Sequence, residues 1–192
     1  HLKKVREAAE DCFKYEKNGP SYLIIGAHRE LIKKFTEMLG ERSKKKLVGS
    51  YHIMPNYKLN RIKEKSQKII MEYERGIEKR VIEKMFDRSS KKKSLAVFGS
   101  GPVLDNFYQH NVEVIVIGRE FKEKGFVCPD CHYVSSYMRV CPRNKIEMIK
   151  VDDLADEIIE EAIASGTKIK HLIFESKEFD KFGIGAFLRS AV

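Results

Sequence analysis

The sequence predicts an α/β protein of two small domains, each a short, mostly parallel sheet layered with helices. Strand-like apolar runs alternate with helical spacing along the 192 residues. Net charge changes sign near the middle, and three cysteines in one short stretch indicate an inserted zinc-ribbon-like minidomain. We place the boundary at Lys91-Lys92-Lys93, giving domains 1–90 and 94–192 with the insertion at about 124–148.

The first half reads as helix, strand, helix, strand, helix. We expect an amphipathic helix over 2–16 stopped at Asn18-Gly19-Pro20, a strand at 22–25, a helix over 31–39 ended by Gly40, and a basic loop at 42–46. A strand at 47–54 ended by Pro55 and a helix from about 59 to 86 follow, and Gly76 is expected to break or bend that helix.

The second half repeats the alternation. We expect a strand at 95–98, a short helix carrying Val103, Leu104 and Phe107, a strand at 112–117, a helix capped by Asp152 or Asp153 and stopped by Gly166, and strands at 169–174 and 183–189. Residues 112–117 are nearly all β-branched, so we expect this strand to be central in the sheet, with both faces covered.

Charge is divided unevenly between the halves. Residues 1–93 carry 25 Lys and Arg against 13 Asp and Glu, a net +12, whereas the remainder carries a net −3. The positive charge of the first half would attract a phosphate backbone. The weakly negative charge of the second half is better suited to binding a protein partner. The candidates for RNA contact are Arg42, Lys44, Lys45 and Lys46, together with the helix face bearing Lys63, Lys65 and Lys68. The alternative is that these are solvated, lysine-rich helices.

The cysteine pattern resembles a zinc ribbon with one ligand missing. Cys128-Pro-Asp-Cys131 forms one pair, but the second pair would be Cys141 and position 144, which is Asn144. The site either gains a ligand elsewhere, with His132 the nearest candidate, or has lost its metal. Either way the chemistry favours a structural element, because a catalytic zinc keeps an open position among His and carboxylate ligands.

No catalytic constellation is evident in the sequence. Gly99-Ser100-Gly101 lacks the rest of a nucleotide-binding fingerprint and predicts a plain strand-to-helix turn. No nucleophile accompanies His28 or His52 in a recognisable triad. We therefore expect His28 to lie in a surface turn or to contact a phosphate, and His52 to have a structural role.

Several features favour a cytoplasmic segment of a longer protein. The cysteines are clustered rather than spread through a disulfide framework, and no apolar run approaches the length of a membrane span. The chain starts at His1 without Met or an apolar targeting segment, and enters a helical pattern at once.

The second half resembles the C-terminal domain of archaeal and eukaryotic class I peptide chain release factors. The matching stretches are Leu95 to Gly99, Asn111 to Ile117, the Cys-Pro-Asp-Cys ribbon, Leu154 to Glu157, Gly166 to Lys168, and Gly183 to Arg189, which is the most specific. The ribbon favours a release factor over the related rescue factor Pelota. Asn144, the His110-Asn111 pair and the single glycine after Phe182 depart from the family pattern.

The first half resembles the remainder of that family's middle domain, through residues 5–10, 22–26 and 59–70. The resemblance implies contacts with the ribosome, tRNA and rRNA, with a class II release-factor GTPase and with a ribosome-recycling ATPase. In the family, a Gly-Gly-Gln loop promotes peptidyl-tRNA hydrolysis. No Gly-Gly-Gln occurs in these 192 residues, so we expect this segment not to be an enzyme by itself.

Two other hypotheses remain open. The chain could derive from a divergent ribosome-rescue or quality-control peptidyl-tRNA hydrolase, or from a non-catalytic RNA-binding module. The loop and any codon-reading domain preceding His1 would discriminate between them.

Overall fold

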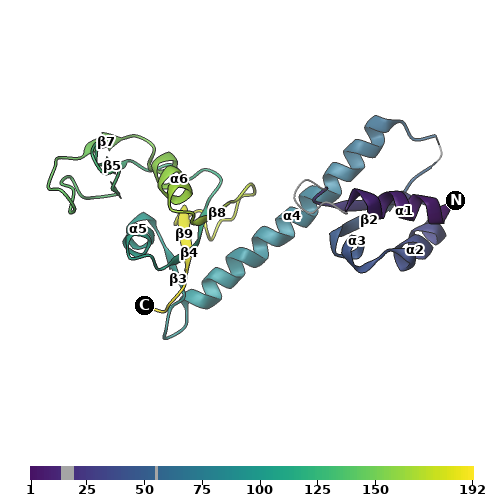
Figure 1. The fold of residues 1–192 in the computed structure, drawn as a ribbon, viewed down its shortest axis with the longest axis horizontal. Coiled ribbons are helices and arrows are strands. Elements are labelled where there is room, and N and C mark those ends of the chain that lie inside the picture. Colours follow the sequence, from purple (N-terminus) through teal and green to yellow (C-terminus); the bar gives the residue numbers. More distant parts are fainter. Residues whose placement is uncertain (14–19, 55) are drawn as a thin grey trace. The chain divides into compact units, whose positions relative to one another are not determined.

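A computed structural model describes residues 1–13, 20–54 and 56–192, which divide into two compact units, His1–Ile77 and Glu78–Val192 (Figure 1). The division falls inside a helix rather than at the predicted Lys91–Lys93 linker. The cause is packing, since Ile82 and Met85 of that helix are buried in the core of the second unit. Among the described residues, no helix is both long and apolar enough to cross a bilayer.

The first unit is built on a two-stranded parallel sheet, β1 (Leu23–Ala27) with β2 (Leu47–His52). It also holds α1 (Leu2–Cys12), α2 (Arg29–Met38), α3 (Glu41–Lys46) and the first part of α4 (Leu59–Ser89). Its small core is centred on Ile25, Phe35 and Leu39. The predicted positions 14–16, Asn18, Gly19 and Pro55 lie outside the described residues.

Two expectations for this unit were wrong. The basic stretch predicted as a loop is the helix α3, which buries Ser43 completely. Gly76 does not interrupt α4, which is continuous over 31 residues. Glycine in a helix costs only about 1 kcal/mol relative to alanine, which neighbouring packing can offset.

The second unit contains a four-stranded sheet in the order β3-β9-β4-β8. Its strands are β3 (Ala96–Phe98), β4 (Val112–Ile117), β8 (Lys168–His171) and β9 (Ile184–Leu188). The α/β class is confirmed, and β3, β4 and β8 run in the predicted common direction. However, β9 lies between β3 and β4 and is antiparallel to both. The sheet is therefore mixed.

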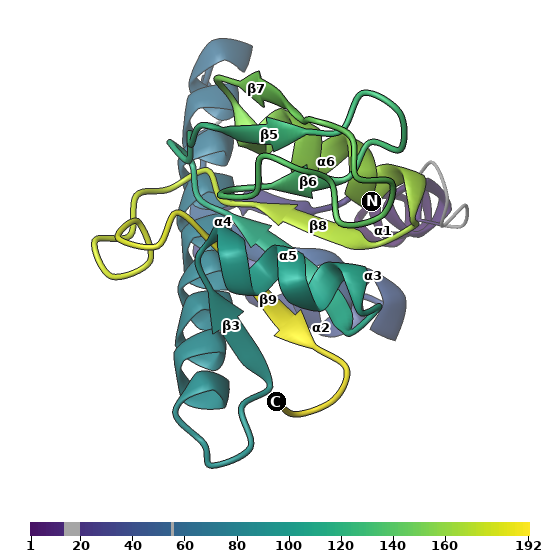
Figure 2. The same cartoon turned by 90° about the vertical axis from the view of Figure 1, so that its left-hand side faces the viewer.

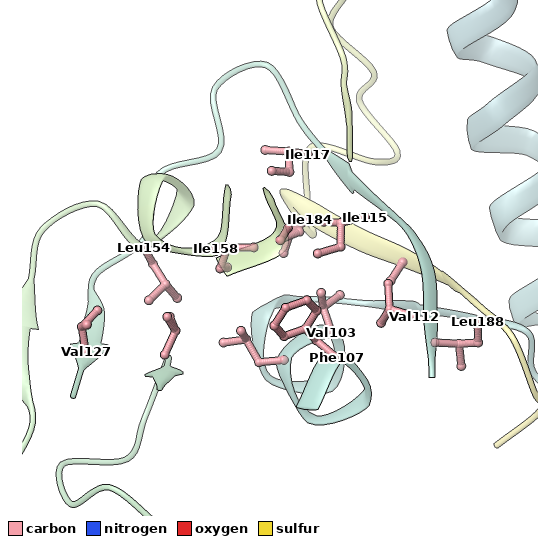
Figure 3. Close-up of a cluster of buried hydrophobic side chains, with 14 residues drawn as sticks. Val103, Phe107, Val112, Ile115, Ile117, Val127, Leu154, Ile158, Ile184 and Leu188 are labelled. Atoms are coloured by element: carbon pink, nitrogen blue, oxygen red, sulfur yellow. The ribbon is translucent and has the colours of Figure 1, made fainter. Parts of the chain in front are cut away.

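Helices cover both faces of this sheet, as the β-branched sequence of β4 predicts. On one face, α5 (Ser100–Tyr108) and α6 (Leu154–Ala164) bury a cluster that includes Ile115, Ile117 and Ile184 (Figure 3). On the other face, the last turns of α4 pack on Val116 and Phe187. Asp153 is the N-cap of α6, because its side chain accepts a hydrogen bond from Ala155 N.

The strand predicted over 169–174 ends at His171. The backbone N–H groups of Ile173 and Phe174 donate instead to the carboxylate of Glu78 on α4, at 2.9 and 3.0 Å. Glu78 is only 2% exposed, although it is an acidic residue. Beyond His171, a side chain of α4 therefore accepts the backbone hydrogen bonds that a neighbouring strand would otherwise accept.

A second, three-stranded sheet, β6-β5-β7, lies between β4 and α6 in the sequence (Figure 2). Its strands are β5 (Gly125–Val127), β6 (Val134–Ser135) and β7 (Ile149–Val151), all pairing antiparallel. We call residues 125–151 the ribbon. All three cysteines of the predicted zinc-ribbon-like insertion lie in it.

Candidate metal centre and nucleic-acid interface

The ribbon presents its cysteines on two turns with the same local geometry. In the first, His132 N donates to Cys128 O at 3.1 Å, and His132 has a left-handed φ of 54°. In the second, Lys145 N donates to Cys141 O at 3.0 Å, and Lys145 has a φ of 63°. In each turn the backbone N–H of the first cysteine also donates a hydrogen bond. Cys128 N donates to Tyr133 O, and Cys141 N donates to Ile146 O, both at 2.9 Å.

This equivalence assigns a place to position 144. Cys131 is the third residue after Cys128, and Asn144 is the third residue after Cys141. Each directly precedes the left-handed residue of its turn. Asn144 therefore occupies the corner where a four-cysteine ribbon carries its last ligand.

The three thiols are brought together as the spacing predicts. The sulfur atoms of Cys128, Cys131 and Cys141 all lie within 4.8 Å of one another, and Cys131 Sγ is 3.5 Å from Cys141 Sγ. Asn144 Nδ2 lies 3.3 Å from Cys128 Sγ and donates to Asp130 Oδ2 at 2.8 Å. The donor set, three sulfurs and one amide, fits a thiophilic metal such as zinc.

Local hydrogen bonds prepare one thiol for metal binding. Burial opposes ionisation of Cys128, but the backbone N–H groups of Cys131 and Asp130, together with the Asn144 amide, lower its pKa to about 6. Burial raises the pKa of Cys131, and its neighbouring cysteines act in the same direction. The thiolate is the form that binds metal, so the lowered pKa favours Cys128 as a metal ligand.

The pKa of Cys128 gives a measurable pH dependence. We expect Cys128 of the metal-free protein to be mostly thiolate at pH 7 and to protonate as the pH falls through about 6. An unfolded cysteine ionises near pH ~8.5. The lowered folded pKa therefore favours the folded state fully above that unfolded value, and the contribution disappears as pH falls through the folded pKa.

Thiolate ultraviolet absorbance measured against pH, with Cys128→Ser as the control, tests this expectation. An unchanged titration near pH 6 in Cys128→Ser would contradict it, because the thiolate would then belong to another cysteine.

His132 does not join the sulfur cluster in the described residues. Its electrostatic influence falls on α6, where burial raises the pKa values of Glu157 and Glu161 and His132 lowers them. The left-handed backbone at His132 ends the first turn. Cys12 is exposed in the first unit and is also outside the cluster.

An aromatic stack that the sequence did not reveal joins the ribbon to α5. The rings of Tyr108 and Tyr133 stack at 4.1 Å, and the Arg143 guanidinium lies 4.9 and 5.2 Å from their centroids. Tyr108 Oη accepts a hydrogen bond from Val134 N at 2.6 Å, while burial raises the pKa of Tyr108. These contacts position the ribbon from outside the metal cluster.

The basic residues proposed for RNA lie on two helices of the first unit. Arg42, Lys44, Lys45 and Lys46 are exposed on α3, and the three lysines form its last turn. Lysines there also complement the helix dipole. Lys44 lies 3.5 Å from the Glu41 carboxylate in an exposed pair, which contributes little to stability.

The second set does not form a single face. Because successive residues of a helix are about 100° apart, Lys65 and Lys68 share a stripe with Arg61, whereas Lys63 points about half a turn away from Lys65. Lys65 Nζ also lies 5.7 Å from the ring centroid of Tyr51 and 5.5 Å from that of Tyr57. Helical periodicity in the sequence could have identified Arg61 as a neighbour of Lys65. It could not have identified Tyr51 and Tyr57, because they lie outside α4.

His28 and His52, which the sequence leaves without catalytic partners, meet at the carboxyl end of β1 and β2. Their ring centroids are 4.8 Å apart, and both line a surface pocket of about 680 Å³ together with Arg29. Glu30 and Leu31 complete the described lining of this pocket, which includes a carboxylate but no serine, threonine or cysteine nucleophile.

The fold of this chain is similar to that of a solved structure. Dom34 of S. cerevisiae, described as "a translation termination-like factor involved in RNA quality control pathways and interacting with Hbs1", aligns with the whole chain. The TM-score is 0.61 at 13% identity, over 52% of Dom34. At this identity the match concerns the fold.

The sequence comparison gives a more particular relative. The chain is similar to peptide chain release factor subunit 1 of Thermococcus onnurineus, with 25% identity over 98% of the chain, and to that of Thermococcus sibiricus, with 23%. The release-factor resemblance is thereby confirmed. The chain spans about half the length of these relatives, 52% in each case. No family model matches it.

Proposed function

We propose that this chain is the second half of a translation termination factor, which contacts ribosomal RNA and tRNA through its first unit and a translational GTPase through its second. The observation that carries the proposal is similarity to a release factor along 98% of the chain. No Gly-Gly-Gln occurs in these 192 residues, so in this proposal peptidyl-tRNA hydrolysis depends on parts of such a factor outside them. A cytoplasmic setting follows from this role.

The charge distribution supports the RNA contact. The net +12 of residues 1–93 is concentrated on exposed side chains such as those of α3. Arg42, Lys44, Lys45 and Lys46 would contact phosphates from α3, and Lys65 and Lys68 from α4. Lys63 would do so only from another side of α4.

The GTPase contact is supported by the fold match of the whole chain and by the charge of the second unit. Dom34 is described as interacting with Hbs1, and the net −3 of residues 94–192 suits a protein partner better than a phosphate backbone. We assign the GTPase, and subsequently a ribosome-recycling ATPase, to this unit.

A ribosome-rescue or quality-control role is the second candidate. The observation favouring it is the fold match between the whole chain and 52% of Dom34, which is described as involved in RNA quality control pathways. A full-length protein that releases peptide from a ribosome programmed with a stop codon would support termination. Activity only on stalled ribosomes would support rescue, and failure in both assays would leave an RNA-binding module.

RNA contact through phosphates makes a salt-dependent prediction. We expect binding of this chain to tRNA to weaken linearly on a log–log plot against salt concentration, because bound lysines release counterions. Replacing Lys44, Lys45 and Lys46 together by Ala should flatten the slope by about 2 to 3. Lys79→Ala, on an exposed ion pair of α4, is the control. A slope unchanged by the triple substitution would remove α3 from the interface.

For the ribbon we propose a structural zinc ion bound by Cys128, Cys131 and Cys141, with the amide oxygen of Asn144 at the fourth corner. The equivalence of the two turns supports this choice over His132. Elemental analysis of the purified protein tests it, with about one zinc per chain expected. Zinc retained in Cys128→Ser and Cys141→Ser would rule the site out.

A further inference from the structure

An aromatic ring and two cationic side chains lie close together at the start of α4. Tyr57 N donates to Met54 O at 3.1 Å, which closes a turn two residues before the helix begins at Leu59. The Arg61 guanidinium lies 4.6 Å from the centroid of the Tyr57 ring, and Lys65 Nζ lies 5.5 Å from it. We call Tyr57, Arg61 and Lys65 the cation–tyrosine cluster.

The two tyrosines near Lys65 have different environments. The hydroxyl of Tyr51 lies 3.3 Å from Ile62 O and 3.4 Å from Ser66 Oγ, and its ring lies against Gly26. Tyr51, on β2, therefore packs and hydrogen-bonds between the sheet and α4. Tyr57 instead lies in the turn, half-buried, between exposed Asn56 and exposed Lys58.

The cations extend from this ring as a stripe. Lys58, Arg61, Lys65 and Lys68 follow one another at spacings of three, four and three residues, which places them along one side of the helix. Three of these side chains are exposed, and Lys65 is half-buried against the rings. A line of cations beginning at a tyrosine matches what single-stranded RNA offers, namely regularly spaced phosphates and unstacked bases.

We propose that Tyr57 and Arg61 form a stacking platform for an unpaired nucleobase of RNA, with Lys58, Lys65 and Lys68 holding the adjoining phosphates. This inference rests on the proposed RNA contact and names the kind of RNA that it takes. Arginine and tyrosine faces accept any base, so the platform selects unpaired nucleotides over duplex and has little sequence preference.

The test uses the chain's lack of tryptophan. In the Tyr57→Trp variant the single indole reports directly on stacking, and we expect its fluorescence to be quenched by a short single-stranded RNA. An abasic RNA of the same length should bind with little quenching. Equal quenching by both RNAs would overturn the proposal, because it would report proximity to the backbone.

Affinity measurements separate stacking from charge. Tyr57→Leu should weaken binding of the single-stranded RNA by about 5- to 100-fold with an unchanged salt slope, since stacking releases no counterions. Tyr57→Phe should bind like the parent, which also controls for folding. Lys68→Ala should instead reduce the slope by about 0.7. Tyr137→Leu, which removes an exposed tyrosine of the ribbon, is the matched control.

The outcomes distinguish the two proposals. Normal binding by Tyr57→Leu, with Lys68→Ala still weakened, would overturn the platform and leave the RNA contact standing. Failure of the parent chain to bind any RNA would overturn both.

Discussion

Asn144→Cys is expected to raise the affinity of the ribbon for zinc by more than about a hundredfold. The substitution places a thiolate donor at the corner that Asn144 occupies, opposite the three existing sulfurs. Disturbing a group that merely supports a metal ligand already changes affinity by about 10- to 100-fold, and a fourth thiolate completes the tetrahedral set itself.

Competition against a chromophoric chelator at fixed pH measures this effect. Glu147→Cys is the control, because it adds a thiol at an exposed position of the same ribbon. We expect a concurrent rise in thermal stability with zinc, because an ion that binds only the folded state stabilises it, and little change without zinc. Equal affinities for Asn144→Cys and Glu147→Cys would show that position 144 does not face the site.

Glu78→Ala is expected to lower the free energy of unfolding of the second unit by about 3 to 5 kcal/mol. The buried carboxylate accepts from Ile173 N and Phe174 N. A hydrogen bond to a charged group contributes about 1.5–3 kcal/mol, and buried donors left without a partner add their own penalty. Glu78→Gln retains one acceptor oxygen, so we expect roughly half the loss.

Urea denaturation gives the free energy, and hydrogen exchange of the Ile173 and Phe174 amides locates the effect. Glu83→Ala is the matched control on the same helix, because its pair with Lys79 is exposed and should contribute less than about 1 kcal/mol. If Glu78→Ala and Glu83→Ala unfold alike, the carboxylate does not hold this segment.

Patterns of apolar residues within a short stretch of sequence predicted correctly the elements that are buried periodically or along their whole length. The strand at 112–117 was predicted with its observed bounds, and Asp153 was one of two caps proposed for α6. Such features depend on neighbouring residues only. The antiparallel position of β9 depends on pairing with segments more than 60 residues earlier, which no local pattern encodes.

The candidate sites divide in the same way. The Cys-x-x-Cys spacing predicted the sulfur cluster and the substituted corner at Asn144, because both turns are local. His132 was proposed from proximity alone, but a left-handed residue turns the chain at that point. Tyr57 and Glu78 were missed, although Glu78 lies one helical turn from buried Ile82, and a carboxylate on an apolar stripe is a usable signal.

The position of β9 also governs the order in which the second unit can be made. β9 joins β3 to β4, and it is the last strand of the sheet along the chain. Until residues 184–188 have left the ribosome, β3 and β4 have no partner on their facing edges, and the apolar side chains of β4 lack part of their cover. Nascent chains arrested before that point therefore expose unpaired strand edges, which are prone to aggregation. The sheet of this unit is therefore completed only when its closing strand emerges.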